Sequence, residues 1–446
     1  MKKRYDSYKP SGIDWIGDIP THWTLSKIKF IGEIRGRIGF RGYTTADLVS
    51  EGEGALTIGG KHISNNVIDL TDPEYISWDK YYESPEIMVS KGDIVIAQRG
   101  TLKRTAYISK NIGPATINPS LVLLTNIKIN PKYLHSYLCS NATTEFIDYL
   151  NTATAVPMIS QNQIENIRII EPPLAEQEAI AAWLDEKCGE IDAAIAKVDR
   201  EIELIDELKQ SEISRVVTRG LNPDAPLRPS GIDWIGNIPL NWSSMKLKHT
   251  VKDIETDFMD GDWIESTDIS TEGIRYLTSG NIGAGYYKEQ GEGFISEETF
   301  AELNCIEVFP GDLLISRLNE PIARTCFIPD LGYRIVTCVD NVIYRPIGNL
   351  FDKRYIMYQL NCKPFWFNAS QLSSGATMQR ISRSKLGAIK VLVPPLLEQQ
   401  AIADYLDKKC AEIDGLKAKL SKKRETLTEL RQSIISEVVT GKRKVI

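Results

Sequence analysis

The chain carries the same two sequence motifs twice, and this internal repeat constrains its fold more than any other feature. Residues 10–23 read PSGIDWIGDIPTHW and residues 229–242 read PSGIDWIGNIPLNW, so 11 of 14 positions are identical at an offset of 219. Residues 172–192 and 394–414 share 15 of 21 positions at an offset of 222. The stretches between these motifs have little in common. A repeated frame with different contents predicts one scaffold that presents two different binding units.

The composition limits the classes of protein to which this chain can belong. Its 446 residues are 42% hydrophobic and 25% charged, which is ordinary for a globular protein with room for two to four domains. No stretch approaches the ~18 apolar residues of a membrane span, and no signal peptide is recognisable. The seven cysteines include no CxxC pair, which favours reduced thiols and a cytoplasmic location. The net charge of −6 does not point to nucleic acid, although a local basic face can coexist with it.

The repeat predicts the order globular unit, helix, globular unit, helix. The stretch Gly220–Gly231 has three prolines and two glycines, cannot continue a helix, and is predicted to be a linker. Short apolar runs after turn signals, at residues 91–97 and 310–316, predict strands, whereas residues 133–149 and 353–362 are amphipathic and predict helices. The expected fold class is therefore α+β, with mixed helices and strands. The predicted segments are residues 1–171, 172–220, 221–393 and 394–446, the last with a basic tail.

Two long helices are predicted, at about Leu174–Arg219 and Leu396–Thr440. Proline pairs stand at their starts, where a missing N–H costs little, and Gly220 and Gly441 stand at their ends. An apolar register repeats every seven residues in both helices, which is the pattern of a coiled coil. We expect the helices to pair antiparallel within one chain; the alternative is that each lies only on its own globular unit. The seam residues are Leu184, Ile191, Val198 and Ile205 in the first helix and Leu406, Ile413, Leu420, Leu427 and Ile434 in the second.

The heptad position beside this seam differs between the two helices. The first helix has Ile195 and Ile202 there, and the second has Lys417 and Arg424. Either the aliphatic stems of these two cations extend over the edge of the partner helix, or the pairing is looser at that level.

No catalytic motif is recognisable in the sequence. The four histidines are dispersed and form no HExxH pair, so no metal site is predicted. Residues 57–63 read TIGGKHI, but Ala55 replaces the glycine that a phosphate loop requires, and His62 follows Lys61 where Ser or Thr is needed. The glycine fingerprint of dinucleotide-binding folds and the NPPY-type tetrapeptide of amino-methyltransferases are also missing from the sequence. We therefore predict no catalytic residue and no cofactor site in this chain.

Polar and basic side chains gather in the divergent middles of the two halves. Arg and Lys suit guanine edges and phosphates, whereas Asn and Gln suit adenine. Any single exposed Arg or Gln is more often a solvated surface residue, so the clusters carry more weight than their members. Arg99 and Arg317 follow matching strands but differ in position by one residue, so their equivalence stays open. The candidate DNA-contact residues are Lys61, His62, Gln98, Arg99, Lys103, Arg104, Gln161, Asn162, Asn281, Arg317, Asn319, Arg324, Gln379, Arg380 and Arg383.

The repeated motifs resemble those of a known family. PSGIDWIG…IP..W opens each half, PPLxEQxAIAxxLDxKCxEID opens each long helix, and both are similar to motifs of the specificity subunits of type I restriction–modification systems. The resemblance covers the whole chain in order, as a recognition domain followed by a spacer helix, twice. It implies two pseudo-twofold-related target recognition domains, each reading one half of a split sequence in double-stranded DNA. It also implies that the two long helices form an antiparallel coiled coil that spaces the domains.

The resemblance further implies partners and cofactors. Two copies of a modification subunit would dock on the repeated helices, bind S-adenosylmethionine and methylate adenine. A restriction or motor subunit, where present, would bind ATP and Mg²⁺ and cleave, while the specificity subunit itself carries no catalysis. Helices of ~45 residues would be roughly 68 Å long at about 1.5 Å per residue, so domains that lean inward could meet DNA grooves about one turn, or about 34–36 Å, apart.

Two other functions stay open on the sequence alone. A fused restriction–methylation enzyme would need a methyltransferase or nuclease segment in the chain, and none is recognisable. A non-catalytic scaffold that binds proteins would show no sequence-dependent affinity for DNA, even with its partner present.

Overall fold

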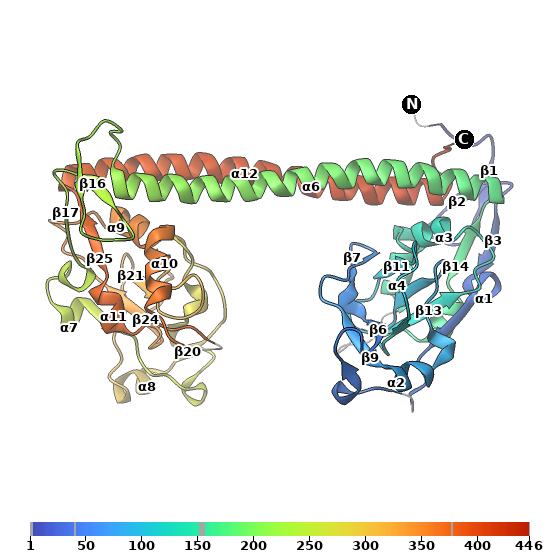
Figure 1. Ribbon diagram of the computed structural model, residues 1–446, viewed down its shortest axis with the longest axis horizontal. Coiled ribbons are helices and arrows are strands. Elements are labelled where there is room, and N and C mark those ends of the chain that lie inside the picture. Colours follow the sequence, from blue (N-terminus) through green and yellow to red (C-terminus); the bar gives the residue numbers. More distant parts are fainter. Residues whose placement is uncertain (1–2, 40–41, 151–156, 376–377, 446) are drawn as a thin grey trace. The chain divides into compact units, whose positions relative to one another are not determined.

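The chain forms two compact units, and both long helices contribute to each of them. The computed structural model describes residues 3–39, 42–150, 157–375 and 378–445. The first unit contains residues 1–199 and 422–446, and the second contains residues 200–421. Helices α6 (Leu174–Arg219) and α12 (Leu396–Val439) therefore each give one part to either unit (Figure 1). Both helices begin and end within one residue of the predicted limits.

The first unit is built on two four-stranded sheets. One sheet, in the order β11-β10-β13-β4, is antiparallel throughout, and the other, in the order β12-β6-β9-β5, pairs β12 with β6 in parallel. The strands of these sheets are β4 (Glu33–Gly36), β5 (Leu48–Val49), β6 (Gly54–Ile58), β9 (Glu74–Ser77), β10 (Ile94–Ala97), β11 (Thr105–Tyr107), β12 (Ala115–Ile117) and β13 (Leu121–Thr125). The shorter elements are α1 (Ile28–Ile31), β7 (Ile63–Ser64), β8 (Val67–Ile68), α2 (Trp78–Tyr82), α3 (Pro131–Leu138), α4 (Asn141–Leu150) and α5 (Gln161–Glu165).

The second unit repeats most of this topology with a different sequence, but its second sheet has three strands rather than four. Its antiparallel sheet has the order β22-β21-β24-β18, and its other sheet has the order β23-β19-β20 with β23 parallel to β19. The strands are β18 (Phe258–Asp260), β19 (Ile274–Leu277), β20 (Phe294–Ile295), β21 (Leu313–Ser316), β22 (Thr325–Phe327), β23 (Ile335–Thr337) and β24 (Asn341–Tyr344). The helices are α7 (Ile254–Asp257), α8 (Glu297–Glu302), α9 (Lys353–Leu360), α10 (Lys363–Gln371) and α11 (Arg383–Ala388).

The predicted α+β class is confirmed in both units. The apolar runs near residues 91–97 and 310–316 form the buried central strands β10 and β21. The amphipathic stretch at residues 133–149 is two helices rather than one. The break falls at Ser140, whose hydroxyl donates to the carbonyl oxygen of Tyr137 (2.6 Å) and so competes with the helical hydrogen bond.

The repeated motifs close each unit where its chain enters and leaves. In the first unit, the hairpin β1 (Tyr8–Pro10)–β2 (Asp18–Pro20) leads into β3 (Thr24–Lys27), which pairs with β14 (Arg168–Glu171) immediately before α6. The second unit repeats this arrangement. Its elements are β15 (Leu227–Pro229), β16 (Asn237–Pro239), β17 (Ser243–Lys246) and β25 (Lys390–Val393), paired in the same way.

A carboxylate at the start of α6 binds the repeated hairpin segment. Glu176 accepts hydrogen bonds from Tyr5 Oη (3.0 Å) and Trp23 Nε1 (3.0 Å), and its other oxygen lies 2.6 Å from His22 Nε2. Burial alone would raise the pKa of this carboxyl. The three hydrogen bonds outweigh burial and lower the pKa below its ordinary value. Glu176 thus anchors the hairpin segment to the helix in the first unit, and the matching Glu398 of the second unit accepts from Asn241 Nδ2 (3.3 Å).

The glycine after each long helix is required by backbone conformation and by space. Gly220 and Gly441 have φ of +75° and +74°, which L side chains rarely adopt. A Cβ atom on Gly441 would also lie 2.2 Å from Cδ of Pro20. The helix end therefore packs directly on the repeated hairpin segment.

Each unit completes its core with the end of the helix from the other half of the chain. Ile435, Val438 and Val439 of α12 join the core of the first unit. Their counterparts at an offset of 222, an isoleucine and two valines of α6, join the core of the second unit. These counterparts are Ile213, Val216 and Val217.

Ion pairs hold α6 and α12 in antiparallel register within each unit. In the first unit, Arg431 and Arg424 of α12 lie 2.7 Å and 2.6 Å from Asp192 and Asp199 of α6. In the second unit, Lys417 binds Asp206 (2.7 Å) and Lys209 binds Asp414 (2.7 Å). Every step of seven residues forward along α6 is matched by a step of seven backward along α12. Exposed pairs of this kind contribute roughly 0.2–1 kcal/mol each, so they specify register more than they stabilise.

These ion pairs decide between the two arrangements expected for the cations beside the seam. Lys417 and Arg424 extend over the edge of the partner helix, where each meets an aspartate. The seam itself lies inward, and none of its residues is exposed. Those that are buried are Leu184, Val198, Ile205, Leu406, Ile413 and Ile434, and those that are half-buried are Ile191, Leu420 and Leu427.

Replacing Val198 by aspartate tests the seam. Val198 is 1% exposed, so Val198→Asp would bury a carboxylate without a partner and lower the free energy of unfolding by about 3–5 kcal/mol. The matched control is Ala196→Asp, which places the same charge on the exposed face two residues away. Urea unfolding followed by far-UV circular dichroism measures both variants. Equal stability of the two variants would contradict a packed seam at this level.

Candidate nucleic-acid interface

The predicted DNA-contact residues lie on matching loops of the two units. They flank the ends of β6 and β19, the ends of β10 and β21, and the starts of α5 and α11. Burial divides them into three groups. The buried ones are His62, Asn281, Arg317 and Arg324; the half-buried ones are Gln98, Lys103, Arg104, Gln161 and Arg380; the exposed ones are Lys61, Arg99, Asn162, Asn319, Gln379 and Arg383.

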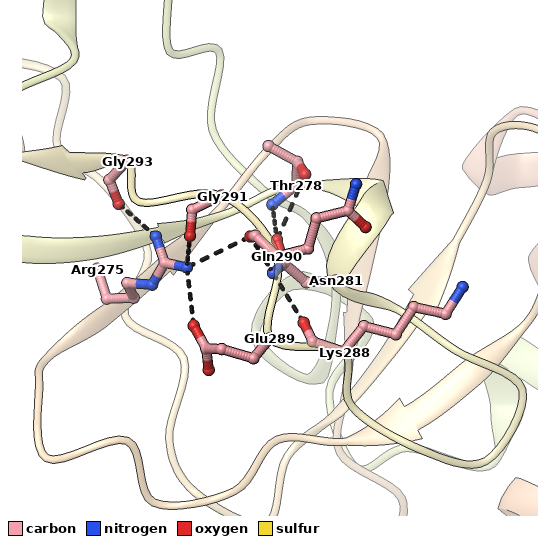
Figure 2. Close-up of polar contacts among 8 residues, drawn as sticks. All are labelled: Arg275, Thr278, Asn281, Lys288, Glu289, Gln290, Gly291 and Gly293. Carbon is pink, nitrogen blue, oxygen red and sulfur yellow. Dashed lines mark hydrogen bonds and ion pairs between the residues drawn. The ribbon is translucent and has the colours of Figure 1, made fainter. Parts of the chain in front are cut away.

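Asn281 holds together the loop that follows β19. Its Oδ1 accepts a hydrogen bond from the backbone N–H of Thr278 (2.9 Å). Its Nδ2 donates to the carbonyl oxygens of Lys288 (3.0 Å) and Gln290 (2.7 Å), as Figure 2 shows. Next to it, Arg275 donates to the carbonyl oxygen of Gly293 (2.8 Å) and fastens the end of the same loop. These contacts occupy the amide of Asn281 within the chain, so it shapes the loop rather than facing outward.

His62 does in the first unit what Asn281 does in the second. Its Nδ1 accepts from the backbone N–H of Gly59 (2.9 Å), which leaves Nε2 to donate to the carbonyl oxygen of Asp72 (3.0 Å). A neutral ring protonated on Nε2 satisfies both contacts. The backbone bonds match as well, because His62 N–H bonds to Gly59 as Asn281 N–H bonds to Thr278. The expectation of direct base contact is therefore weakest for these two residues.

An arginine connects this loop to the next one in both units, half-buried as Arg104 in the first and buried as Arg324 in the second. Arg104 donates to the carbonyl oxygen of Gly60 (2.8 Å). Arg324 donates to the matching carbonyl of Ser279 (2.9 Å) and to that of Ile282 (2.7 Å). Because the same residue type makes the same contact twice, its task is structural.

Both predicted lysines are paired with carboxylates at the surface. Lys61 lies 2.7 Å from Asp72 and 2.9 Å from Glu74, and Lys103 lies 2.7 Å from Asp148. Their charge is opposed within the chain, although exposed pairs of this kind separate at low cost.

In the second unit, three arginines gather around two aspartates at the end of β21. Arg317 lies 3.1 Å from Asp260, and Arg383 reaches the same carboxylate at 3.5 Å. Arg380 binds Asp340 at 2.8 Å. Burial raises the pKa of Asp260, although the arginines act to lower it, and burial likewise lowers the pKa of Arg317. We call these five residues the arginine cluster.

The first unit has no charged residue at the matching positions. The carbonyl oxygen of Gln98 accepts from Ile159 N–H just as that of Arg317 accepts from Ile381 N–H. The side chain of Gln98 donates to the carbonyl oxygen of Pro119 (3.0 Å) instead of to a carboxylate. The strand register and the backbone hydrogen bonds give each residue of the arginine cluster a counterpart in the first unit. These counterparts are Gly36 for Asp260, Gln98 for Arg317, Ser120 for Asp340, Met158 for Arg380, and Gln161 for Arg383.

This register also resolves the relation between Arg99 and Arg317. Arg99 forms a bridge with Met158, and Leu318 forms the matching bridge with Arg380. Arg99 is therefore the counterpart of Leu318, and the two arginines are not equivalent. The sequence pattern of basic and amide residues did not point to Asp260 and Asp340. These carboxylates belong to the site only because they bind and orient its arginines.

Among the residues that the structure describes, no group of three His, Cys, Asp or Glu side chains is arranged to hold a metal ion. No helix in the described ranges is long and apolar enough to span a bilayer.

Comparison with known proteins places the chain in one family. The profile described as "Type I restriction modification DNA specificity domain" matches twice, over residues 21–203 and 251–423. The MjaVIII type I restriction enzyme specificity subunit of Methanocaldococcus jannaschii is 24% identical over 368 residues, covering 81% of each chain. The putative MjaX specificity subunit of the same organism is 24% identical over 451 residues, covering 96% of each.

A solved structure shares the fold. A chain from a study described as the structural basis of complex assembly and conformational transition of the type I R-M system has a TM-score of 0.65. The match covers 94% of this chain and 98% of that chain, with 17% sequence identity. At this identity the similarity concerns the fold alone.

The loop after β19 depends on the amide of Asn281, and removing it tests that dependence. Asn281→Ala would remove the hydrogen bonds that the buried amide of Asn281 makes with the backbone of Thr278, Lys288 and Gln290, and would lower the free energy of unfolding by about 1–3 kcal/mol. Hydrogen exchange over residues 279–290 would also become faster. Gln290→Ala, an exposed change in the same loop, is the control. Unchanged exchange in both variants would contradict the structural role.

Proposed function

The chain belongs to the type I restriction modification DNA specificity family, and from that premise we propose that it selects the DNA target of such a system by reading a sequence with two dissimilar halves. The observation that carries the proposal is one fold built twice with different residues at its loop ends. The antiparallel sheet and the parallel strand pair recur in both units, whereas the arginine cluster of the second unit has uncharged counterparts in the first. Equal scaffolds with unequal contact residues suit an asymmetric, bipartite target.

We propose that the residues contacting DNA are the half-buried and exposed members of the predicted set, apart from Arg104, which connects two loops. The side chains of these residues are at least partly accessible to a ligand, whereas the buried members hold in place the loops that carry them. The net charge of −6 is compatible with this arrangement, because an excess of arginine is local to one part of the second unit. Partner subunits would supply further phosphate contacts.

The chemistry is assigned to partners rather than to this chain. We propose that two copies of a modification subunit dock on the repeated segments, bind S-adenosylmethionine and methylate adenine. A restriction subunit, where the system has one, would bind ATP and Mg²⁺. Each unit offers its own copy of the same exposed residues, Glu190 and Asp192 in the first and Glu412 and Asp414 in the second. Two equal surfaces on one chain suit two copies of one partner.

We also propose that the paired helices set a constant gap between the half-sites. Helix α6 continues from one unit into the other without a break between Leu174 and Arg219. A helix restrains the separation of what it carries more strictly than a flexible linker does. Val198→Asp would then weaken partner docking or spacing as well as the fold.

The first test is to co-express the chain with its neighbouring modification subunit and to map methylated adenines by single-molecule sequencing of genomic DNA. A split motif with two dissimilar halves and one fixed gap is expected. A stable complex whose DNA affinity is independent of sequence would favour the protein-binding scaffold instead. Methylation at an undivided motif would contradict two separate reading units.

Replacing residues 24–170 by the corresponding segment of another family member tests which unit reads which half. One half of the methylated motif should change while the other half and the gap stay the same, because the second unit is untouched. The control is Glu178→Gln, which copies Gln400 from the matching position of α12 and should leave the motif unaltered. A change in both halves on segment exchange would contradict independent reading.

A further inference from the structure

The arginine cluster and its uncharged counterpart mark one place in the fold where the two units differ in charge. We infer that Gln161 and Arg383 read a base at this same place of the two units, Gln161 an adenine edge and Arg383 a guanine edge. The inference rests on the proposed function, and it deepens that function by naming the side chains and bases.

The backbone presents Gln161 and Arg383 in the same way. Each follows a buried isoleucine and a serine, in the sequence Ile-Ser-Gln in the first unit and Ile-Ser-Arg in the second. The serine hydroxyl caps the short helix by accepting a backbone N–H, from Gln163 to Ser160 and from Lys385 to Ser382, at 3.3 Å in both units. The isoleucine and the serine therefore position the backbone, and only the third residue is free to vary.

In the second unit, two contacts restrain the side chain of Arg383 and leave it partly exposed. Its Nη1 donates to the carbonyl oxygen of Phe258 (3.2 Å), and its Nε lies 3.5 Å from Asp260. The side chain is still 43% exposed, so part of the guanidinium stays open to a ligand. Arg317 behind it is 5% exposed and shares the same carboxylate. With Arg380 included, three guanidinium groups face two carboxylates, which leaves an excess of positive charge.

In the first unit, the same place is shaped for an amide. Gly36 stands where the second unit has Asp260, and a Cβ atom there would lie 2.3 Å from Nε2 of Gln161. The missing side chain thus makes room for the Gln161 amide. Within the described residues, no hydrogen bond engages this amide, whereas that of Gln98 beside it is bound to the backbone. Gln161 is therefore the member of the pair that is open to a ligand.

The change of charge between the units distinguishes base reading from phosphate binding. Every DNA sequence offers the same phosphates, so a phosphate contact would keep its cation in both units. Where the task is common to both units, the residue is indeed kept, as Arg104 and Arg324 show. An exchange of Arg for Gln on an unchanged backbone fits a change of base, because Arg binds O6 and N7 of guanine and Gln binds N6 and N7 of adenine.

The experiment uses the full chain in its complex with the modification subunit. The half-site read by each unit is known from exchanging residues 24–170, and wild-type methylation shows that the system is active. Arg383→Gln should reduce discrimination for guanine by about 10- to 100-fold at one position of the half-site read by the second unit. The other half-site should not change. The control Arg334→Gln removes a guanidinium of similar exposure, 41%, that is paired with Glu297 and Glu307.

Two more variants distinguish the loss of a base contact from a general loss of folding. Arg383→Lys keeps the charge but not the planar fork, so it should relax the same position while retaining affinity. If Arg383→Gln proves inactive at all sites, the lysine variant decides between the outcomes. Gln161→Ala should relax one adenine in the half-site read by the first unit, in an uncharged setting where a general loss of electrostatic attraction plays no part.

Three results would overturn the inference while leaving the proposed function intact. The first is a wild-type split motif that neither Arg383 variant alters. The second is uniformly slower methylation with an unchanged motif and a shallower dependence of DNA binding on salt, which would identify Arg383 as a phosphate contact. The third is relaxation in the wrong half-site. A wild-type complex that methylates no split motif would instead overturn the proposed function itself.

Discussion

Antiparallel pairing of α6 with α12 is the interaction on which both units depend. Neither half of the chain completes its own core. The last turns of α12, Ile435–Val439, pack into the core of the first unit, and the last turns of α6, Ile213–Val217, pack into the core of the second unit. The ion-pair ladder adds little stability, yet it excludes a shifted register, in which the aspartates of α6 would lose their cations. The repeated glycines then let each helix end contact a repeated hairpin. One pairing therefore explains why the motifs at the edges of both halves stayed alike.

The interiors of the two units follow a different rule. The strands common to both units keep the same order and the same parallel pair, although few residues match, because buried positions demand only apolar side chains of suitable volume. Residues that hold the loops keep their role rather than their identity: His62 and Asn281 each accept a hydrogen bond from the matching backbone N–H, that of Gly59 and that of Thr278. Positions that neither pack in the core nor hold a loop in place, such as Gln161 and Arg383, are free to differ between the units. A recognition surface requires this freedom.

Charge is organised locally in this chain. An acidic total coexists with a cluster in which three arginines outnumber two aspartates, and the aspartates keep the guanidinium groups oriented. Buried arginines stabilise the backbone of the loops. Arg324, for example, donates to several carbonyl oxygens, and its side chain is buried. The burial of an arginine therefore matters more than its presence when a contact with DNA is considered.

The sequence by itself determined the repeat, the two long helices to within one residue, the α+β class and the family. These follow from heptad spacing, terminal proline and glycine, and the motifs, all of which act over short ranges of chain. It also located the loops that matter, but not the task of each residue on them. Only the tertiary structure separated His62, Asn281, Arg317 and Arg324, which are buried, from neighbours of the same type that face outward. It also revealed Asp260 and Asp340 as partners of the arginines, because burial and pairing depend on residues some 40 to 120 positions away.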